Sequence, residues 1–270
     1  MTKPLHEDTA LITGASSGIG AIYADRLAHR GYDLILVARD HKRLTELAKR
    51  LTGEAGINAE VLQADLTCRA DSERVEKRLR ADSRITLFLN NAGVALAGGL
   101  ADGDADRVQS MIELNILAPT RLMMAATGAF VEHKRGTIIN ISSVTALMPE
   151  QFNGAYSGSK AYILNLSLRL QQEVGSKGIR VQVVLPGLTR TEIYGRAGID
   201  PARFPSSSMM GAEELVDAAL PGLDQGEVVT IPSLPDPADW VAFSAARLKL
   251  GPNLSHDHAA SRYQLNADSR

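Results

Sequence analysis

The sequence predicts a single α/β domain built on a doubly wound parallel β-sheet with helices on both of its faces. Short apolar runs alternate with longer stretches of helical periodicity along the chain, and no internal repeat or low-complexity linker interrupts them. The runs at 33–38 and 138–141 are almost continuously apolar, as is typical of parallel strands buried on both faces. We place this domain at residues 1–250 and a polar tail at 251–270.

Composition excludes several functional classes. The 270 residues carry a formal net charge of −2 with acidic and basic residues interleaved, which argues against a nucleic-acid partner. The single cysteine, Cys68, excludes an internal disulfide and a cysteine-based metal site. No further ligands converge with His256 and His258, so no metal is predicted. The N-terminus lacks the apolar core of a signal peptide and no apolar run approaches a membrane span, so we expect a cytoplasmic protein without membrane contact.

A glycine-rich turn separates the first predicted strand, at 9–13, from a helical pattern that continues to about residue 30. Glycines allow the backbone to approach a pyrophosphate, and the helix N-terminus supplies N–H donors and the positive end of its dipole. The spacing G-x-x-x-G-x-G differs from the standard dinucleotide fingerprint, and a plain tight turn is the alternative. The turn consists of Gly14, Ala15, Ser16, Ser17, Gly18, Ile19 and Gly20.

The second strand, at 33–38, ends in a basic residue where NAD-binding proteins place an acid for the ribose hydroxyls. The guanidinium of Arg39 suits a 2′-phosphate through charge-assisted, bidentate bonds, and the hydroxyl of Ser16 is a further donor. Asp40 follows directly and complicates the assignment, and a solvated strand-end charge is the alternative. Arg39 therefore favours NADP over NAD, which we keep as the less favoured cofactor.

A helix is predicted at 41–52, and two further strands, at 59–64 and 85–89, end in residues suited to a nucleotide. Asp65, followed by Leu66, ends the first of them, where a carboxylate can accept a hydrogen bond from an adenine amine. Capping of a helix near 69–81 is the alternative role for Asp65. The second strand runs into small residues that allow a close backbone approach, and these are Asn91, Ala92 and Gly93.

A long helical pattern at about 104–133 contains Asn115 and, four residues later, Pro119. Proline lacks the N–H that would bond the carbonyl of Asn115, so the helix should kink here and leave that carbonyl free. A free carbonyl beside a polar side chain is suited to hold a water. A simple break between two helices is the alternative.

The stretch 138–160 contains the parts of a proton-transfer site. An apolar strand ends in Ser142-Ser143, and Tyr156 and Lys160 lie four residues apart at the start of a helix predicted at 154–175. That spacing places both side chains on one helix face, within reach of each other. An ordinary amphipathic pair is the alternative reading of this spacing.

The strand at 179–185 is followed by Pro186, Gly187, Thr189 and Thr191, which we assign to the nucleotide site. The irregular segment 188–211 carries apolar residues beyond a strand end, which is typical of a substrate lid. A helix at 212–220, a strand at 228–231 and an amphipathic helix at 236–248 complete the predicted elements. The predicted substrate pocket is bounded by Val94, Leu96, Met148, Phe152, Leu188, Ile193 and Tyr194.

In order and spacing, these motifs resemble the single-domain short-chain dehydrogenase/reductases. The resemblance spans residues 8–232 and implies a Rossmann fold with strand order 3-2-1-4-5-6-7 and a nicotinamide cofactor. It implies a tetrad of Asn115, Ser143, Tyr156 and Lys160. The matching residues are Thr13-Gly14-x-x-x-Gly18-Ile19-Gly20, Asn90-Asn91-Ala92-Gly93, Asn115, Ser143 thirteen residues before Tyr156, Tyr156-x-x-x-Lys160 and Pro186-Gly187.

The resemblance implies an oxidoreductase that interconverts a ketone or aldehyde and an alcohol by hydride transfer, with NADP preferred. Tyr156 would exchange the proton, Lys160 would lower the pKa of Tyr156 and bond the cofactor, and Ser143 would hold the substrate oxygen. Asn115 would hold a water that touches Lys160. The family habit also implies a homodimer or homotetramer.

Two other classes compete with this interpretation. A nicotinamide-binding regulator or scaffold without turnover needs neither Tyr156 nor Ser143, so the intact tetrad argues against it. A sugar-nucleotide epimerase or dehydratase uses related tyrosine and lysine chemistry but generally needs a larger C-terminal substrate domain. Only 39 residues (270 − 231) follow the last predicted strand, too few for such a domain.

Overall fold

The computed structural model describes residues 8–263, which form two compact units. The first ends at Pro232 and carries the sheet, and the second begins at Ser233 and carries α9 (Pro237–Lys249). The boundary expected from the sequence is at residue 250, because the apolar pattern of 236–248 resembles that of a core helix. No residue of α9 is buried, and the rings of Trp240 and Phe243 lie 5.5 Å apart.

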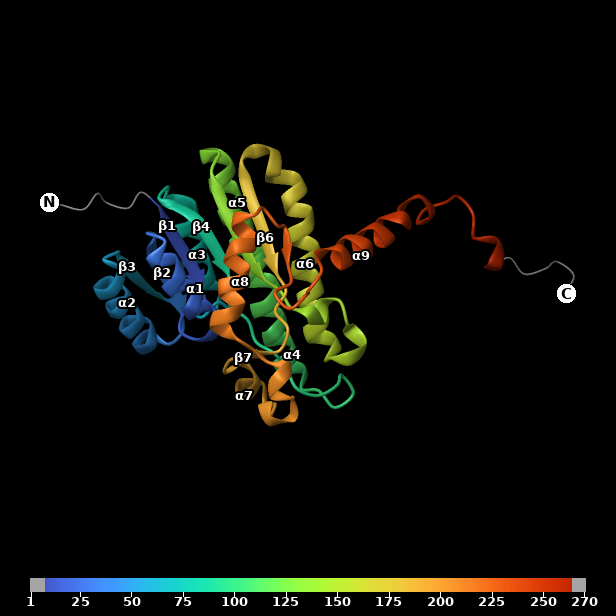
Figure 1. The fold of residues 1–270 in the computed structure, drawn as a ribbon, viewed down its shortest axis with the longest axis horizontal. Helices are drawn as coiled ribbons and strands as arrows, with labels where there is room; N and C mark the ends of the chain where they lie inside the picture. Colours follow the sequence, from blue (N-terminus) through green and yellow to red (C-terminus); the bar gives the residue numbers. More distant parts are fainter. Residues whose placement is uncertain (1–7, 264–270) are drawn as a thin grey trace, which may run out of the picture. The chain divides into compact units, whose positions relative to one another are not determined.

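Seven parallel strands form the sheet of the first unit, in the order β3-β2-β1-β4-β5-β6-β9 (Figure 1). This confirms the doubly wound sheet and the expected order, with β9 as the seventh strand. The strands are β1 (Thr9–Thr13), β2 (Asp33–Ala38), β3 (Ala59–Gln63), β4 (Ile85–Asn90), β5 (Gly136–Ile141), β6 (Ile179–Val184) and β9 (Val229–Thr230).

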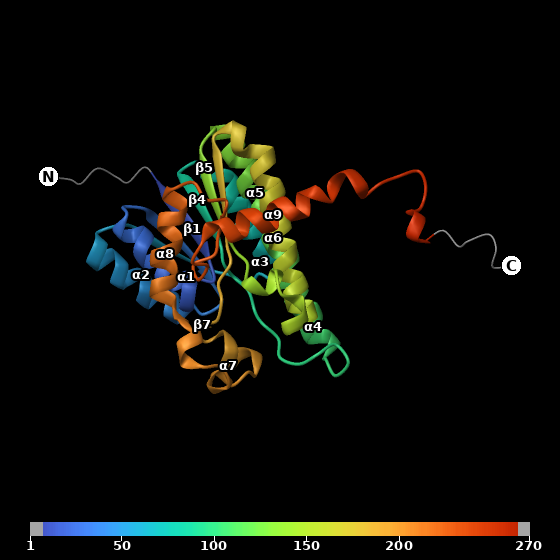
Figure 2. The ribbon, with the colours of Figure 1, turned by 45° about the vertical axis from the view of Figure 1, so that its right-hand side comes forward.

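Helices cover both faces of the sheet, with α1, α2 and α8 on one face and α3, α5 and α6 on the other (Figures 1 and 2). Their boundaries lie close to the predicted ones. The helix α2 continues beyond residue 52 because its stop signal is Gly56, which has a left-handed backbone with φ of 67°. The helices are α1 (Gly18–His29), α2 (His41–Ala55), α3 (Arg69–Ala81), α4 (Ala105–Ile112), α5 (Ala118–His133), α6 (Gly154–Val174) and α8 (Ala212–Asp224).

Alternate residues of each strand face the layer of α1, α2 and α8. In β1 these are Ala10 and Ile12, and in β2 they are Leu34 and Leu36, all of which are fully buried. The residues between them, such as Leu11, are also buried because helices cover the opposite face. Burial on both faces explains why these strands are continuously apolar rather than alternating, and it fixes the sheet edge at which the strands end.

The predicted interruption of the long helix near Asn115 is confirmed as a π-helical turn, Glu113–Leu117, between α4 and α5. The N–H of Ala118 bonds the carbonyl of Glu113, five residues back. Pro119 follows in the first turn of α5 and has no N–H to donate. The hydroxyl of Thr120 donates to the carbonyl of Ile116 at 2.6 Å, so a side chain replaces part of the lost backbone bonding.

By length and composition alone, the helical stretch Ala105–His133 is apolar enough to cross a membrane. Half of its apolar window is buried inside the structure, where it packs beside α3 and the sheet. Such a helix is weak evidence for a membrane, because core helices pass the same test. The expectation of no membrane contact stays a prediction.

The predicted lid, 188–211, is more regular than expected. It contains a short helix, α7 (Ile193–Ala197), and a two-stranded parallel sheet of β7 (Thr189–Arg190) and β8 (Met210–Gly211). The glycines and prolines of this segment do not preclude regular structure. Gly198 closes α7 with φ of 77°, and Pro201 begins a short 3₁₀ helix, Pro201–Arg203.

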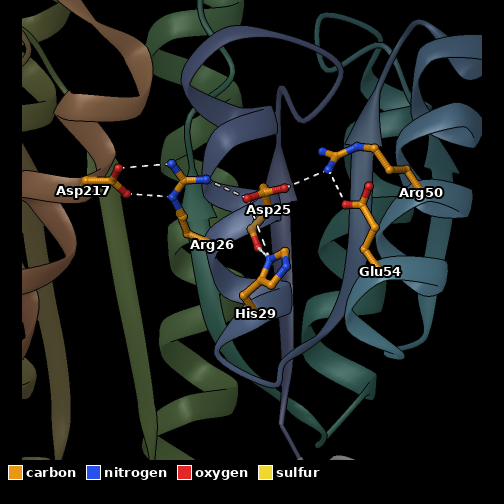
Figure 3. Close-up of polar contacts among 6 residues, drawn as sticks. All are labelled: Asp25, Arg26, His29, Arg50, Glu54 and Asp217. Carbon is orange, nitrogen blue, oxygen red and sulfur yellow. Dashed lines mark hydrogen bonds and ion pairs between the residues drawn. The ribbon is translucent and has the colours of Figure 1, made fainter.

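An ion-pair network joins three helices on one face of the sheet (Figure 3). Asp25 of α1 accepts from Arg26 at 2.7 Å and from Arg50 of α2 at 2.9 Å. Arg26 also forms a two-pronged pair with Asp217 of α8, at 2.7 and 3.1 Å. Burial alone raises the pKa of Asp25, but the bonds from Arg50 and Arg26 outweigh burial and hold that pKa below its usual value. The carboxylate of Asp25 is therefore a tether between α1 and α2.

Replacing Asp25 with asparagine should lower the free energy of unfolding by about 2 kcal/mol at neutral pH, the usual scale for a hydrogen-bonded, poorly exposed charge. Because the pKa of Asp25 is lowered by folding, its contribution is complete above the unfolded-state pKa of about 3.9 and is lost as pH falls through the folded-state value. Denaturant titrations of both proteins at neutral and acidic pH should therefore show a difference that shrinks with acid. The matched control is Asp224→Asn, which breaks an exposed pair with Arg30 and should cost less than about 1 kcal/mol.

Candidate active site

A cavity of about 620 Å³ lies at the carboxyl ends of the parallel strands. In an open α/β sheet this is the edge where ligands bind. Every residue assigned to the nucleotide from the sequence lines it except Gly20. The lining residues so predicted are Gly14, Ser16, Ser17, Gly18, Ile19, Arg39, Asp65, Leu66, Asn91, Ala92, Gly93, Tyr156, Lys160, Pro186, Gly187, Thr189 and Thr191.

The glycine-rich turn is packed directly against the end of β4. Gly14 has φ of 68°, and a Cβ there would lie 2.7 Å from Nδ2 of Asn91. Gly20 is buried beneath the turn, where a Cβ would lie 2.3 Å from the carbonyl oxygen of Gly14. Nδ2 of Asn91 donates to the carbonyl of Thr13 at 2.9 Å, which ties the two strand ends together. No side chain caps α1. Its first residues, Gly18 and Ile19, line the cavity, so the N-terminal end of the helix lies where a dinucleotide phosphate fits.

Arg39 lies at the rim of the cavity with its side chain 67% exposed, and its nearest acidic neighbour is Asp65 at 3.8 Å. The carboxylate of Asp40 is directed to α2 instead of Arg39, because it accepts from the backbone N–H of Arg43 and caps that helix. Asp65 accepts from the N–H and hydroxyl of Thr67. The alternative role of Asp65 as the cap of α3 is wrong, since the cap position of that helix is Cys68.

Ser143, Tyr156 and Lys160 converge on one side of the cavity. Ser143 is close enough to Tyr156 for its hydroxyl to act on the pKa of the tyrosine, and Nζ of Lys160 lies 5.7 Å from the centre of the tyrosine ring. Nζ of Lys160 donates to the carbonyl of Ile141 at 3.1 Å, which fixes the ammonium beneath the strand end. The N-cap residue Asn153 accepts from the N–H of Tyr156 at 3.0 Å, so the start of α6 is set directly at the reacting groups.

Burial dominates the titration of both groups. It raises the pKa of Tyr156 to about 12, although the hydrogen bond with Ser143 acts in the opposite direction. It lowers the pKa of Lys160 to about 8. The sequence predicts that Lys160 lowers the pKa of Tyr156. In the protein without ligand, burial has the largest effect on that pKa, and it raises the pKa. The positive charge of an oxidised nicotinamide is the remaining group that would favour the phenolate.

Asn115 is buried in the π-helical turn, behind the cavity lining rather than within it. Its Oδ1 accepts from the N–H of Val94 at 3.0 Å, and its Nδ2 donates to the carbonyl of Val94 at 2.9 Å and to the hydroxyl of Ser159 at 3.2 Å. The amide therefore pins the loop after β4 to α6. A Cβ on Gly93 would lie 3.4 Å from Nζ of Lys160, so the small residue predicted there lets the loop approach the ammonium.

Most of the predicted substrate pocket also lines the cavity, namely Val94, Leu96, Phe152, Leu188, Ile193 and Tyr194. Met148 is not among the residues that line the cavity in this structure. It lies 43% exposed just before the 3₁₀ turn Pro149–Gln151. Sequence reasoning missed Leu114, Ile199, Phe204 and Asn153. Of these four residues, Asn153 could have been found from the sequence, because an asparagine three positions before Tyr156 is a typical helix N-cap.

Among residues 8–263, no group of three or more histidine, cysteine, aspartate or glutamate side chains is placed to hold a metal ion. His258 instead pairs with its neighbour Asp257 at 2.5 Å.

Comparison with known proteins agrees with this site. Residues 8–201 match the family described as short chain dehydrogenase. A short-chain dehydrogenase from Sphingobium yanoikuyae, solved in complex with NADPH, is 50% identical, with 95% of this chain and 100% of that chain covered and a TM-score of 0.93. The bulky-bulky ketone specific alcohol dehydrogenase from Comamonas testosteroni is 43% identical, with 96% and 99% covered and a TM-score of 0.88. A 3-oxoacyl-acyl-carrier-protein reductase of Salmonella typhimurium is 33% identical, with 82% of this chain and 92% of that protein covered.

The fold, the site and these matches define an NAD(P)-dependent oxidoreductase. The chain belongs to the short-chain dehydrogenase family.

Proposed function

We propose that the protein is an NADP-preferring oxidoreductase that interconverts a ketone or aldehyde and an alcohol, with Tyr156 as the acid and base. The observation that carries the proposal is the convergence of Ser143, Tyr156 and Lys160 on one cavity, with Nζ of Lys160 held by the carbonyl of Ile141 and 5.7 Å from the tyrosine ring centre. Binding alone needs no such pair of hydroxyls, which disfavours the alternative of a regulator or scaffold without turnover.

The bound dinucleotide would supply or accept the hydride at the substrate carbon. In reduction, the hydroxyl of Ser143 holds the carbonyl oxygen, and Tyr156 transfers its phenolic proton to that oxygen. In oxidation, the Tyr156 phenolate takes the proton from the alcohol. Lys160 supplies a positive charge that favours the phenolate, and the carbonyl of Asn115 would hold a water through which protons pass outward. The residues that would hold the dinucleotide are those of the glycine-rich turn, the Asn91 loop and the Pro186–Thr191 segment.

For the substrate, we propose a ketone with a large apolar group on each side of the carbonyl. Apolar side chains from three separate segments, the loop after β4, the start of α6 and the lid, line the substrate end of the cavity. The rings of Tyr194 and Phe204 pack at a tilt of 53° within the lid, with 5.5 Å between their centres. The Comamonas testosteroni enzyme, 43% identical over 96% of this chain, is described as specific for bulky-bulky ketones, which supports the same substrate class here.

A panel of ketones and aldehydes of graded size, read by loss of NADPH absorbance, tests the activity and the substrate class together. We expect turnover, with kcat/KM higher for diaryl ketones and for aryl ketones with a bulky alkyl group than for the corresponding aryl methyl ketones. NADPH binding without turnover on any carbonyl, or on any alcohol with NADP, would instead favour the regulator.

Replacing Arg39 with aspartate should shift the preference from NADP towards NAD. The exposed guanidinium has no short ion pair, so its donors are available to a 2′-phosphate, and their loss should lower kcat/KM with NADP by about a hundredfold. The ratio of kcat/KM for the two cofactors is the measurement. Arg69→Asp, on the outer face of α3, is the charge-matched control and should leave the ratio unchanged. An unchanged ratio in Arg39→Asp would reject the NADP assignment.

The cytoplasmic location and the homo-oligomer stay predictions. Large apolar side chains exposed on α4 to α6 support an oligomer, and these are Ile112, Leu117, Met124 and Tyr162.

A further inference from the structure

Three charged side chains connect the lid to α2 beside the cavity, and the mechanism uses none of them. Glu192 begins the lid helix α7, Arg196 lies one turn later, and Arg43 lies on α2, far away in the sequence. Nη1 of Arg43 donates to both carboxylate oxygens of Glu192, at 3.0 and 2.9 Å. Nη2 of Arg196 donates to the same carboxylate at 2.5 Å. Glu192 therefore joins the lid to the nucleotide end of the domain.

The bridging carboxylate is ionised at neutral pH. The hydrogen bond from Arg43 is the main reason that the pKa of Glu192 is held below its usual range, and the charge of Arg196 acts in the same direction. Oδ2 of Asp40 lies 3.5 Å from Nε of Arg43, so the cluster holds two carboxylates and two guanidiniums and is balanced in charge. Of the two guanidiniums, that of Arg196 lines the cavity.

Arg196 also reaches the glycine-rich turn. Its Nη2 donates to the hydroxyl of Ser17 at 3.3 Å, and Ser17 is the residue before the first turn of α1. The hydroxyl of Ser17 does not cap that helix, so it is available to the guanidinium. A cation beside the positive end of a helix dipole is unfavourable by itself, and it becomes favourable when an anion lies between them. The arrangement therefore matches an anionic ligand at this turn.

We propose that Arg196 is a ligand for the diphosphate of the dinucleotide, and that Glu192 and Arg43 position it there. The inference rests on the use of a dinucleotide by this site. Nη2 donates to Glu192 and Ser17, which leaves the Nε–H and Nη1–H groups, on different edges of the guanidinium, as single charge-assisted donors to phosphate oxygens. The diphosphate is common to NADP and NAD, so this contact is distinct from that of Arg39.

The bridge has a consequence for the substrate pocket. Ile193 and Tyr194 lie between the two lid anchors, Glu192 and Arg196, and both line the cavity. Binding of the diphosphate to Arg196 would fix the segment that carries them. The dinucleotide thereby completes the apolar wall against which the substrate packs.

Fluorescence titration of NADPH and NADH, without any carbonyl substrate, tests the proposal by binding rather than by turnover. Arg196→Met should weaken Kd by about tenfold for both dinucleotides, the scale of one charge-assisted contact. Arg196→Lys should recover part of the affinity for both. Glu192→Gln should weaken both by a smaller factor, because it releases the guanidinium without removing it. The matched controls are Arg169→Met and Glu173→Gln, which break an exposed pair of the same spacing on α6 and should leave both Kd values unchanged.

The outcomes separate this inference from the proposed function. If the unmodified protein binds neither dinucleotide, the proposed function fails. If it binds both and Arg196→Met binds them equally well, only the role of Arg196 is overturned. A loss confined to NADPH would place Arg196 at the 2′-phosphate and also overturn the assignment. Thermal unfolding of each variant without ligand shows whether it is folded. If Arg196→Met does not fold, the Kd values of Glu192→Gln and Arg196→Lys still test the proposal.

Discussion

Replacing Tyr156 with phenylalanine should lower kcat about a thousandfold in both directions while leaving the Kd for NADPH within a few-fold of its original value. The change removes only the phenolic oxygen, which is the proton donor in reduction and, ionised, the base in oxidation, and such groups contribute about 10²- to 10⁴-fold. Steady-state rates combined with a dinucleotide titration measure the two effects separately.

The pH dependence gives this substitution a second readout. Burial holds the pKa of Tyr156 high, at about 12, so the phenolate is scarce and alcohol oxidation by the unmodified enzyme should accelerate as pH rises. The residual activity of Tyr156→Phe should lack that rise. Tyr162→Phe, six residues along the same helix, is the control, since the hydroxyl of Tyr162 pairs with Thr120 at 3.0 Å, outside the cavity. Comparable kcat in Tyr156→Phe and the control would remove Tyr156 from the chemistry.

The second large effect is expected at the glycine-rich turn. Adding one methyl group at Gly20 places a carbon 2.3 Å from the backbone oxygen of Gly14 and 2.5 Å from Nδ2 of Asn91. The first atom belongs to the backbone, and the second is held by its hydrogen bond to the carbonyl of Thr13. The turn must therefore move, which distorts the phosphate cradle. We expect Gly20→Ala to weaken dinucleotide binding by at least about a hundredfold and to cost about 1 to 3 kcal/mol of stability, the usual range for overpacking.

Gly53→Ala is the matched control for this prediction. Gly53 lies inside α2 with nothing within 4 Å of the added carbon, so the same methyl group should be neutral or stabilise the fold by up to about 1 kcal/mol. Dinucleotide titration measures the Kd of both variants, and thermal unfolding measures their stability. Tight binding by Gly20→Ala would show that the turn does not hold the phosphates.

Sequence reasoning succeeded where the structure is set locally. The strand, glycine turn and helix at residues 9–29 follow one another within the chain, so the cradle is readable from their order. Tyr156 and Lys160 lie on one face because of helix spacing alone. The parallel sheet then brings these local units to one edge, which is why distant motifs such as Asn91 and Pro186 converge.

The features that were missed depend on contacts between distant segments. The exposure of Met148, in the loop after β5, depends on how that loop folds, and no spacing rule reveals it. The bridge from Arg43 to Glu192 joins residues 149 positions apart. The pKa of Tyr156 reflects how deeply its phenol is buried, whereas the sequence shows only that a lysine lies four residues away.

The π-helical turn at Glu113–Leu117 has a consequence for how this chain tolerates length changes. A π turn holds one more residue than an α turn of the same rise, so α4 and α5 are joined as if a single amino acid had been inserted. Deleting one residue there would let a continuous α-helix form and rotate everything before it by about 100° relative to α5. Asn115 would then turn away from Val94, and the loop after β4 would lose its anchor, although no residue of the cavity lining had been substituted. Length, rather than side-chain chemistry, is thus what this stretch of helix must preserve.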